Sequence, residues 1–381
     1  MQTARLHPAN FRVLGSIEAA AESWRALERE GASSLYQSYD WCAAWLATVG
    51  AAMGVAPRIV VIEAADGQPV AVLPFQLRKK FGTVILEWLG APHVGYGYGL
   101  FAKDFLPRAG VWFAQSLPAI FETIGEADLV LLQEMPEALH GACHPLVRLF
   151  NLRGANRSFA MALRENYDEL YATKRSGETR RSNRKRDHKL ADLGILEFGL
   201  PSTPVETAQV LDHMFADQAN RLAESGVYGV FGETEQAFIR KLAEVPGLLA
   251  PFCLKLDGRI LAVMLGGIHG GNYWALISSL ADGPERRFSP GDAALRRTIE
   301  ACCARGLTRF DFSAGDTSYK PQWADVEIGL HCFVGARRLR GLPLASAYAA
   351  AILVKGLVKR NGTLRRMAMS CRRAVRGKHH Q

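Results

Sequence analysis

The spacing of apolar residues changes several times along the chain. In the first 56 residues it is helical, with Trp41 and Trp45 four residues apart and Asp40 as the expected helix cap. From residue 58 onward apolar and polar residues alternate, which is typical of strands. We predict strands at 58–65, 68–77 and 83–89, then a helix at 111–124 and a strand at 128–133.

The pattern of two alternating segments joined by an Asp-Gly pair occurs twice in the sequence. Asp66-Gly67, between the first two predicted strands, corresponds to Asp257-Gly258, and Ala71-Val72 corresponds to Ala262-Val263 at the same offset of 191 residues. An Asp-Gly pair between alternating segments predicts a tight hairpin turn. Two such hairpins in equivalent places indicate two copies of one α+β module.

A helix and a strand are predicted between residues 286 and 323. Ser289 and Asp292 have the spacing of a capping box, and Pro290 suits the first helical position. The helix should run over 290–305, with Gly306 as its left-handed C-terminal cap. Alternation over 307–313 predicts a strand that leads into a polar segment.

Composition limits the class of protein. Of 381 residues, 49% are hydrophobic and 22% are charged, which is typical of a globular chain of two or three domains. The N-terminus lacks the apolar core of a secretory signal, so a cytoplasmic location is expected. Seven scattered cysteines without a C-x-x-C pair indicate reduced thiols and no metal site.

The net charge of +9 comes from the C-terminus. Twelve Lys or Arg residues and no acid follow Glu327, which leaves 34 basic and 37 acidic residues before that point. A DNA-binding function is therefore not expected of the folded body. The tail beyond residue 341 should form a helix over 343–359, with Leu344, Tyr348 and Ala351 along one side, and its apolar stretch looks too short to cross a membrane. It could contact an anionic membrane surface or simply dock on the protein.

Two further segments have candidate functions. The run from Lys174 to Lys189 has eight Lys or Arg and two acids, which suits either a phosphate-rich ligand or a solvated helix face. The glycine-rich segment 90–100 contains His93, Tyr96 and Tyr98, and could either line a pocket or be structural.

The order of hairpin, strand, basic turn, capped helix and strand resembles the acyl-CoA-binding half of GNAT acetyltransferases. That family usually has Arg/Gln-x-x-Gly-x-Gly/Ala at the turn; here Gly291-Asp292-Ala293 is preceded by Arg286 and Arg287, with Phe288 three residues before Gly291. The chain more closely resembles the CelD-like, cellulose-biosynthesis tandem-GNAT acetyltransferases, which are related to the Fem-type peptidyltransferases. The motifs that carry this likeness are 181–185, Asp257-Gly258, Phe288 to Gly291, Phe310-Asp311-Phe312, Gly315-Asp316, Tyr319-Lys320 and Trp323.

The resemblance implies an α+β fold of two tandem GNAT-like modules, with mixed sheets flanked by helices, and a basic helical tail. The expected domains are 1–155, 156–340 and 341–381. It also implies an acyl-CoA-dependent N- or O-acyltransferase, with acetyl-CoA as co-substrate and no metal. The acceptor would be carbohydrate- or lipid-linked, in exopolysaccharide or cellulose biosynthesis, and would enter a cleft between the modules.

Acyl transfer from a thioester needs a base, oxyanion donors and often an acid. The resemblance implies catalytic roles for Asp311 and Asp316 as bases, Tyr319 as acid, and Lys320. The residues implied in acyl-CoA binding are Arg286, Arg287, Ser289, Pro290, Gly291 and the backbone near Ile277 and Ser279. Those implied in acceptor binding are Arg181, Arg184, Tyr98 and Trp323.

Structural roles remain open for several of these residues. Asp311 could instead bond Arg309 or a loop amide, and Lys320 and Trp323 could serve loop packing. Two other functions are also compatible with the sequence. One is a Fem-like transferase that uses aminoacyl-tRNA, which the 174–189 run could bind, and the other is a non-catalytic scaffold in a polysaccharide-synthesis complex.

Overall fold

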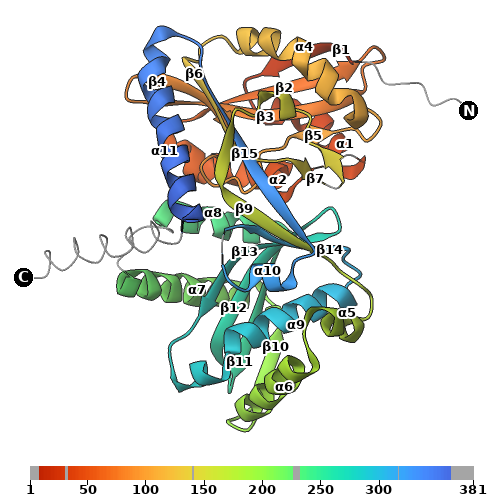
Figure 1. Ribbon diagram of the computed structural model, residues 1–381, viewed down its shortest axis with the longest axis vertical. Coiled ribbons are helices and arrows are strands. Elements are labelled where there is room, and N and C mark those ends of the chain that lie inside the picture. Colours follow the sequence, from red (N-terminus) through yellow and green to blue (C-terminus); the bar gives the residue numbers. More distant parts are fainter. Residues whose placement is uncertain (1–7, 31–32, 140, 226–231, 316, 362–381) are drawn as a thin grey trace, which may run out of the picture. The chain divides into compact units, whose positions relative to one another are not determined.

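The computed structural model describes residues 8–30, 33–139, 141–225, 232–315 and 317–361, which form two compact units (Figure 1). The first unit comprises Met1–Ser158, Ala314–Asp316 and Ile328–Gln381. The second comprises Phe159–Ser313 and Thr317–Glu327. The chain therefore returns to the first unit after it has built the second.

The first unit combines a sheet with helices. Its strands are β1 (Pro8–Leu14), β2 (Ala56–Ala64), β3 (Pro69–Lys80), β4 (Thr83–Trp88), β5 (Leu100–Phe101), β6 (Leu129–Pro136), β7 (Ala138–Leu139), β8 (Ala142–Cys143), most of β9 (Leu152–Ala162) and most of β15 (Val326–Ala336). Its α-helices are α1 (Ala21–Glu30), α2 (Tyr39–Trp45), α3 (Ala51–Met53), α4 (Leu106–Ile124) and α11 (Leu342–Arg360). Single turns are η1 (Glu18–Ala20), η2 (Leu35–Gln37), η3 (Leu46–Gly50), η4 (Val147–Leu149) and η6 (Leu339–Gly341).

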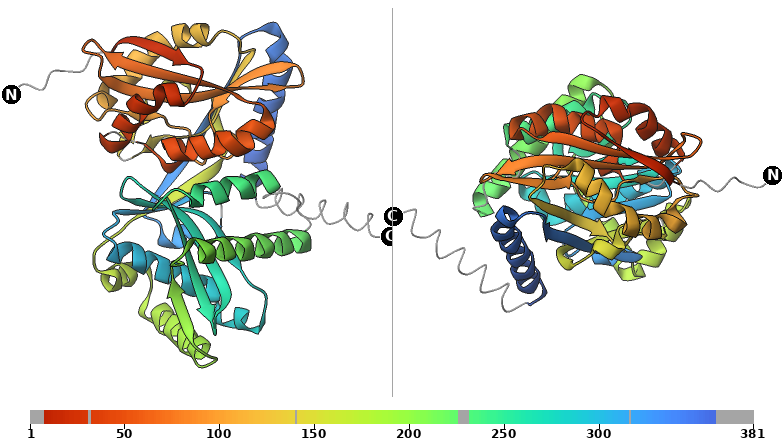
Figure 2. Two further views of the ribbon diagram at one scale, coloured as in Figure 1. Left: turned by 180° about the vertical axis from the view of Figure 1, so that it is seen from behind. Right: turned by 90° about the horizontal axis from the view of Figure 1, so that it is seen from above.

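The second unit has the same kind of construction. Its strands are the end of β9, β10 (Leu196–Gly199), β11 (Leu249–Leu256), β12 (Arg259–His269), β13 (Asn272–Leu280) and β14 (Arg309–Ala314). Its helices are α5 (Tyr167–Lys174), α6 (Gly177–Ala191), α7 (Pro204–Ser225), α8 (Glu233–Ala243), η5 (Pro284–Phe288), α9 (Pro290–Ala304) and α10 (Lys320–Trp323). Helix α9 packs on one face of the sheet and α7 on the other (Figure 2).

The strands of the two units follow equivalent orders. In the first unit the order is β1-β2-β3-β4-β6-β15-β9, and in the second it is β10-β11-β12-β13-β14-β9. Both are antiparallel except for one parallel pair, β4 with β6 and β13 with β14. The repeat seen in the sequence is thus a repeat of structure, and the predicted α+β fold of two similar modules is confirmed.

Most predicted elements are present. The two Asp-Gly turns join β2 to β3 and β11 to β12, and Gly306 has a left-handed φ of 69° after α9. Strand β1 was missed, because we interpreted the first 56 residues as helical throughout. The cap of α2 is also corrected: Ser38, and not Asp40, accepts the hydrogen bond from the backbone N–H of Trp41.

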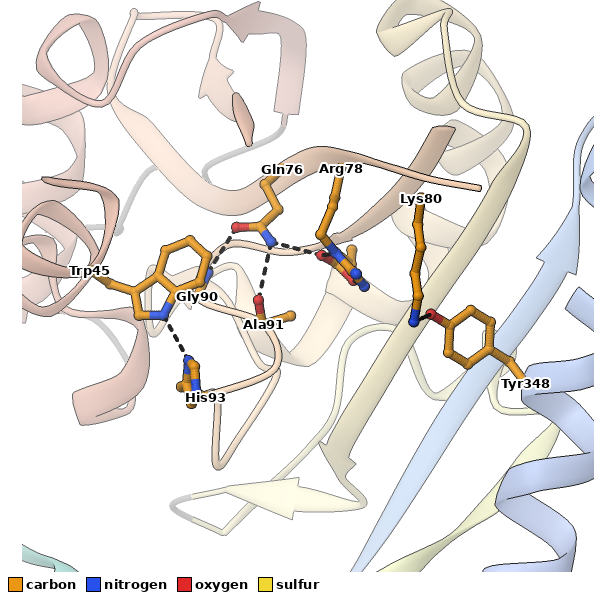
Figure 3. Close-up of polar contacts among 9 residues, drawn as sticks. Trp45, Gln76, Arg78, Lys80, Gly90, Ala91, His93 and Tyr348 are labelled. Carbon is orange, nitrogen blue, oxygen red and sulfur yellow. Dashed lines mark hydrogen bonds and ion pairs between the residues drawn. The ribbon is translucent and has the colours of Figure 1, made fainter. Parts of the chain in front are cut away.

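The glycine-rich segment 90–100 is anchored by a polar network in the first unit (Figure 3). The Gln76 side chain accepts from the N–H of Gly90 at 3.1 Å and donates to the Ala91 carbonyl and to Glu87. Arg78 forms two hydrogen bonds with Glu87, at 2.6 and 2.8 Å. The segment therefore has a structural framework of its own.

The C-terminal helix requires a correction. With η6 it forms a continuous helical span, Leu339–Arg360, of 22 residues, within which an 18-residue stretch has a mean hydropathy of 1.6; by length and composition alone this is enough to cross a membrane. The estimate from the sequence was too short because it stopped at Val354. The face of the helix that packs on the protein also differs from the prediction. Ala351 is exposed, while Ala345, Ile352 and Gly356 are buried.

His144 is a buried, neutral imidazole behind the same glycine-rich segment. Its Nδ1 accepts from the N–H of Leu146 at 2.9 Å, so Nε2 carries the proton and donates to the Gly97 carbonyl, also at 2.9 Å. Burial lowers the pKa of His144 from 6.5 to about 4.

We predict an acid-sensitive contribution of His144 to stability. The unfolded chain binds the proton near pH 6.5 and the folded chain only near pH 4, so stability is lost as the pH falls through this window, by about 3 kcal/mol in total. Urea unfolding between pH 7.5 and 4 measures this loss. His144→Gln should flatten the profile, and an equally steep profile in that variant would contradict the assignment.

Candidate functional site

The parallel strands β13 and β14 separate soon after they pair. Asn272, Tyr273 and Trp274 pair with Arg309, Phe310 and Asp311, after which β13 continues to Leu280 and β14 to Ala314. A β-bulge lies where they part: Ala275 faces Gly266 and Ile277 faces Leu265, which leaves Leu276 as an extra residue on β13. Backbone amides at this place can turn away from the sheet toward a ligand.

Helix α9 begins immediately after β13 and η5. Its first residue is Pro290, which has no N–H, and the N–H groups of Asp292 and Ala293 bond the Ser289 carbonyl. The first N–H of the helix is therefore that of Gly291, which has no intrahelical partner because of its position. A helix start of this kind favours an anion.

The predicted capping box is wrong. Ser289 has a left-handed φ of 58° and makes no side-chain capping bond. Instead its hydroxyl accepts from Arg186 of α6 at 3.2 Å, and Asp292 bonds Arg296 further along the helix at 3.0 Å. These contacts turn the Asp292 carboxylate toward Arg296, which lessens the repulsion of an anion at the helix start.

One basic side chain contacts this helix start, and two more lie in the turn just before it. Arg186 reaches it from α6, while Arg286 pairs with Asp282 at 2.5 Å and Arg287 lies 4.7 Å from the centre of the Phe288 ring. Both Arg286 and Arg287 are exposed. The basic run predicted at 174–189 thus contributes directly to the turn where the sequence located acyl-CoA binding.

Arg296 fixes α6 against α9. Its guanidinium makes two hydrogen bonds to Asp187, at 2.7 and 2.8 Å, in addition to the one to Asp292. The side chain is buried; burial alone opposes its charge, but the carboxylates outweigh burial and raise the pKa of Arg296. Arg186, one residue before Asp187, is positioned by this same contact.

The end of β14 is stabilised by a chain of hydrogen bonds. The fully buried carboxylate of Asp311 accepts from the N–H of Ser313 at 2.8 Å and from Arg309 at 3.4 Å. Lys320 is also buried and donates to the Ser313 carbonyl at 3.2 Å. These contacts fit the structural alternative for Asp311 and Lys320, since they hold Ser313 in its left-handed conformation at φ 56°.

Trp323 and Tyr319 lie on the α10 side of this strand end. The Trp323 ring is fully buried between Tyr171, at 5.8 Å between ring centres, and the Arg175 guanidinium, 4.1 Å from its centre. Tyr319 is half-buried with its ring against Phe312, and burial raises the pKa of its hydroxyl. Tyrosine is protonated at neutral pH already at its ordinary pKa, so Tyr319 is a candidate proton donor by its position and not because of this shift.

The remaining predicted residues are distributed as follows. Ile277 flanks the bulge, and Ser279 faces Val263 with a buried hydroxyl that has no partner among the described residues. Arg181 and Arg184 are exposed on α6. Tyr98 belongs to the first unit, where its ring is fully buried beside His144, and Asp316 lies outside the described residues.

Several residues that shape this region were not predicted individually. Asp187 and Arg186 lay within the basic run, and Arg296 stands four residues after Asp292, a spacing that signals a helical ion pair. Tyr171 and Arg175, which enclose Trp323, gave no sequence signal because their partner lies about 150 residues away.

Comparison with protein families agrees with this geometry. Residues 177–321 match the family model described as an acetyltransferase (GNAT) domain. The matched segment contains α6, the bulged strand β13, η5, α9 and β14. The predicted enzyme class, an acyltransferase of the GNAT type, is confirmed on this domain. A search of curated proteins finds no match to the sequence.

Solved structures share the fold. The crystal structure of FemX has a TM-score of 0.60 at 12% identity, covering 89% of this chain and 99% of that one. The structure of L-PGS from Bacillus licheniformis has a TM-score of 0.52 at 13% identity, with coverages of 89% and 97%. The C-terminal domain of a protein described as a lysylphosphatidylglycerol synthetase from Agrobacterium fabrum also gives 0.52 at 13% identity, with coverages of 90% and 96%. At these identities the likeness concerns the fold alone.

We predict that Arg296→Met destabilises the protein by about 2–3 kcal/mol. This is somewhat below the roughly 3–5 kcal/mol for breaking a fully buried pair, because Asp187 and Asp292 are partly exposed. Urea unfolding gives the free energy. Arg297→Met, at the next position, is the control, because Arg297 makes no ion pair in the described part of the chain. Equal losses in the two variants would show that the ion pair is unimportant.

Proposed function

We propose that the chain is an acyl-CoA-dependent N- or O-acyltransferase whose acyl donor binds in the second unit. The observation that carries this proposal is the parting of β13 from β14 at the Leu276 bulge, next to the start of α9. The first unit has the parallel pair β4 and β6, but its strand β4 has no corresponding bulge, since the register of β3 with β4 runs without a shift from Phe75 to Lys80. The two modules therefore differ at the β-bulge, the feature that would present backbone amides to an acyl donor.

The residues at this site fit the phosphate groups of an acyl-CoA. The Gly291 N–H and the guanidinium groups of Arg186, Arg286 and Arg287 would hold the pyrophosphate by charge and hydrogen bonds. There is also room for a ligand, because a Cβ on Gly291 would meet only the tip of Leu280, at 3.7 Å. When bound, acyl-CoA supplies an activated thioester acyl group.

The protein's own groups would position the acyl donor and supply a proton to the leaving group. Backbone amides around the bulge, at Leu276 and Ile277, would stabilise negative charge on an oxygen near β13. The Tyr319 hydroxyl, which like any tyrosine is protonated at neutral pH, would supply a proton to the departing sulfur. Asp311 remains a candidate base, although its contacts with Ser313 and Arg309 favour a structural role.

The acceptor is proposed to be carbohydrate- or lipid-linked, as the resemblance to CelD-like acetyltransferases implies, with exopolysaccharide or cellulose biosynthesis as the setting. The protein would then work in the cytoplasm. The structures of similar fold have names that refer to a Fem protein and to lysylphosphatidylglycerol synthetases, and their likeness is compatible with an acceptor attached to a cell-envelope component.

We expect acetyl-CoA to bind, and Gly291→Glu to abolish binding without unfolding the protein. A glutamate in the first helical turn favours the helix but repels phosphate, whereas Gly291→Ala fits the available space. Isothermal titration calorimetry with acetyl-CoA measures affinity, and urea unfolding monitors the fold. Absence of heat from the unsubstituted protein at millimolar acetyl-CoA would refute the proposed donor and favour a non-catalytic scaffold.

Tyr319→Phe should separate chemistry from binding. We expect acetyl-CoA affinity to be unchanged and turnover to fall about 100-fold, since a positioned acid contributes roughly that much. Turnover is measured as thiol release with the best acceptor from a panel of amino sugars. Tyr167→Phe, another half-buried tyrosine of this unit, is the control. A drop in affinity with unchanged turnover would exclude Tyr319 as the acid.

A second candidate is transfer from aminoacyl-tRNA, which the exposed arginines of α6 favour. Arg181 and Arg184 are exposed on this helix and make no ion pair among the described residues. Under this alternative, Arg181→Gln with Arg184→Gln weakens tRNA binding and reduces its salt dependence, while leaving acetyl-CoA binding intact. Filter binding of tRNA at 50 and 200 mM salt distinguishes the two donors.

A further inference from the structure

Helix α11 presents its large apolar residues to solvent. Leu353, Val354 and Leu357 are 51%, 58% and 61% exposed, whereas the buried positions are Ala345, Ile352 and Gly356. A surface helix normally buries its large apolar residues. With 3.6 residues per turn, Leu342 and the three exposed residues fall within about a third of the helix circumference, so they form one continuous face.

The polar contacts of α11 lie on its protein side. Lys80 donates to the Tyr348 hydroxyl at 3.3 Å (Figure 3), and Lys359 donates to the Asn156 side chain at 2.6 Å. Just before the helix, Arg340 forms an ion pair with the buried Asp128. These bonds hold α11 along the first unit in a fixed orientation, so its apolar face is directed outward by the fold.

A further exposed apolar residue lies next to this helix. Phe81 is 85% exposed at the tip of the β3–β4 turn, directly after Lys80, which contacts Tyr348 of α11. Phe81 and Gly82 both have positive φ, 50° and 75°, as in the two-residue turns that favour Asn-Gly. The backbone of Phe81 is therefore strained, and its side chain is largely exposed to solvent.

Exposed basic residues lie near these surfaces. Lys79, Lys355 and Arg360 are exposed, and the chain after Glu327 contains twelve Lys or Arg and no acid. An apolar helix face flanked by cations complements an anionic lipid surface, where apolar side chains enter the headgroup boundary and cations meet phosphate.

We propose that the outer face of α11 and the Phe81 turn together form a membrane-binding surface, which inserts shallowly into the interface of an anionic bilayer. The helix lies in the plane of the interface, with its polar side on the first unit and Leu353, Val354 and Leu357 in lipid. This inference does not depend on the acyl donor or the acceptor.

Vesicle flotation of the full-length protein tests the proposal. We expect binding to phosphatidylcholine vesicles with 30% phosphatidylglycerol and little binding to phosphatidylcholine alone. Leu353→Gln with Leu357→Gln should lower the partition coefficient at least tenfold. Leu193→Gln with Ile195→Gln, two exposed apolar residues of the second unit, is the matched control and should leave binding unchanged.

Phe81→Asn separates a binding role from a structural one. Asparagine suits the turn better than phenylalanine, so the urea midpoint should rise while vesicle binding falls severalfold. A structural role for Phe81 would instead lower the midpoint and leave binding as it was.

Three results would overturn the proposal. The first is equal vesicle binding by the Leu353/Leu357 variant and the unsubstituted protein, which would mean that the basic tail alone binds the membrane. The second is a dimer, by light scattering, that the same variant dissociates, which would make this face a contact between two copies. The third is resistance of the membrane-bound protein to alkaline carbonate, which would mean that α11 spans the bilayer.

Discussion

The guanidinium of Arg296 is the contact on which the second unit's site depends. A buried cation is costly unless carboxylates surround it, and here Asp187 comes from α6 and Asp292 from α9. Satisfying that charge fixes the two helices together. It also brings Arg186 to Ser289 and draws the Asp292 carboxylate away from the helix start. The basic character of the turn after β13 is therefore a result of one electrostatic requirement within the fold.

The sequence predicted the framework well, because that framework is encoded locally. The two Asp-Gly hairpins, the helix from Pro290 and its end at Gly306 each follow from a few neighbouring residues. The predicted capping role of Ser289 was wrong, because its hydroxyl accepts a hydrogen bond from Arg186, which lies about 100 residues earlier in the sequence. The bulge at Leu276 and the enclosure of Trp323 could not be predicted, since both arise from the pairing of distant segments.

The two modules show how one framework can support different local properties. Both have an antiparallel meander ending in a parallel pair, and in both the parallel strands pair over only two or three residues. They differ in the strand that enters the parallel pair: β13 has an extra residue against β12, whereas β4 pairs with β3 without a shift. In the first, the corresponding region is filled by the Gln76, Arg78 and Glu87 network and by buried aromatic rings such as Tyr98. The same framework thus has a bulge at this strand in one module and a regular register in the other.

The position of β15 in the first unit has a consequence for how the chain is made. This strand pairs with β6, although some 190 residues, including nearly all of the second unit, separate the two in the sequence. On a ribosome that adds roughly 5–20 residues per second, β6 would wait about 10–40 seconds for its neighbour. During that time one edge of the first sheet is without its final strand, and such edges are prone to wrong pairing. Nascent chains of this protein should therefore need protection, by a chaperone or by provisional pairing within the first module, until β15 has been synthesised.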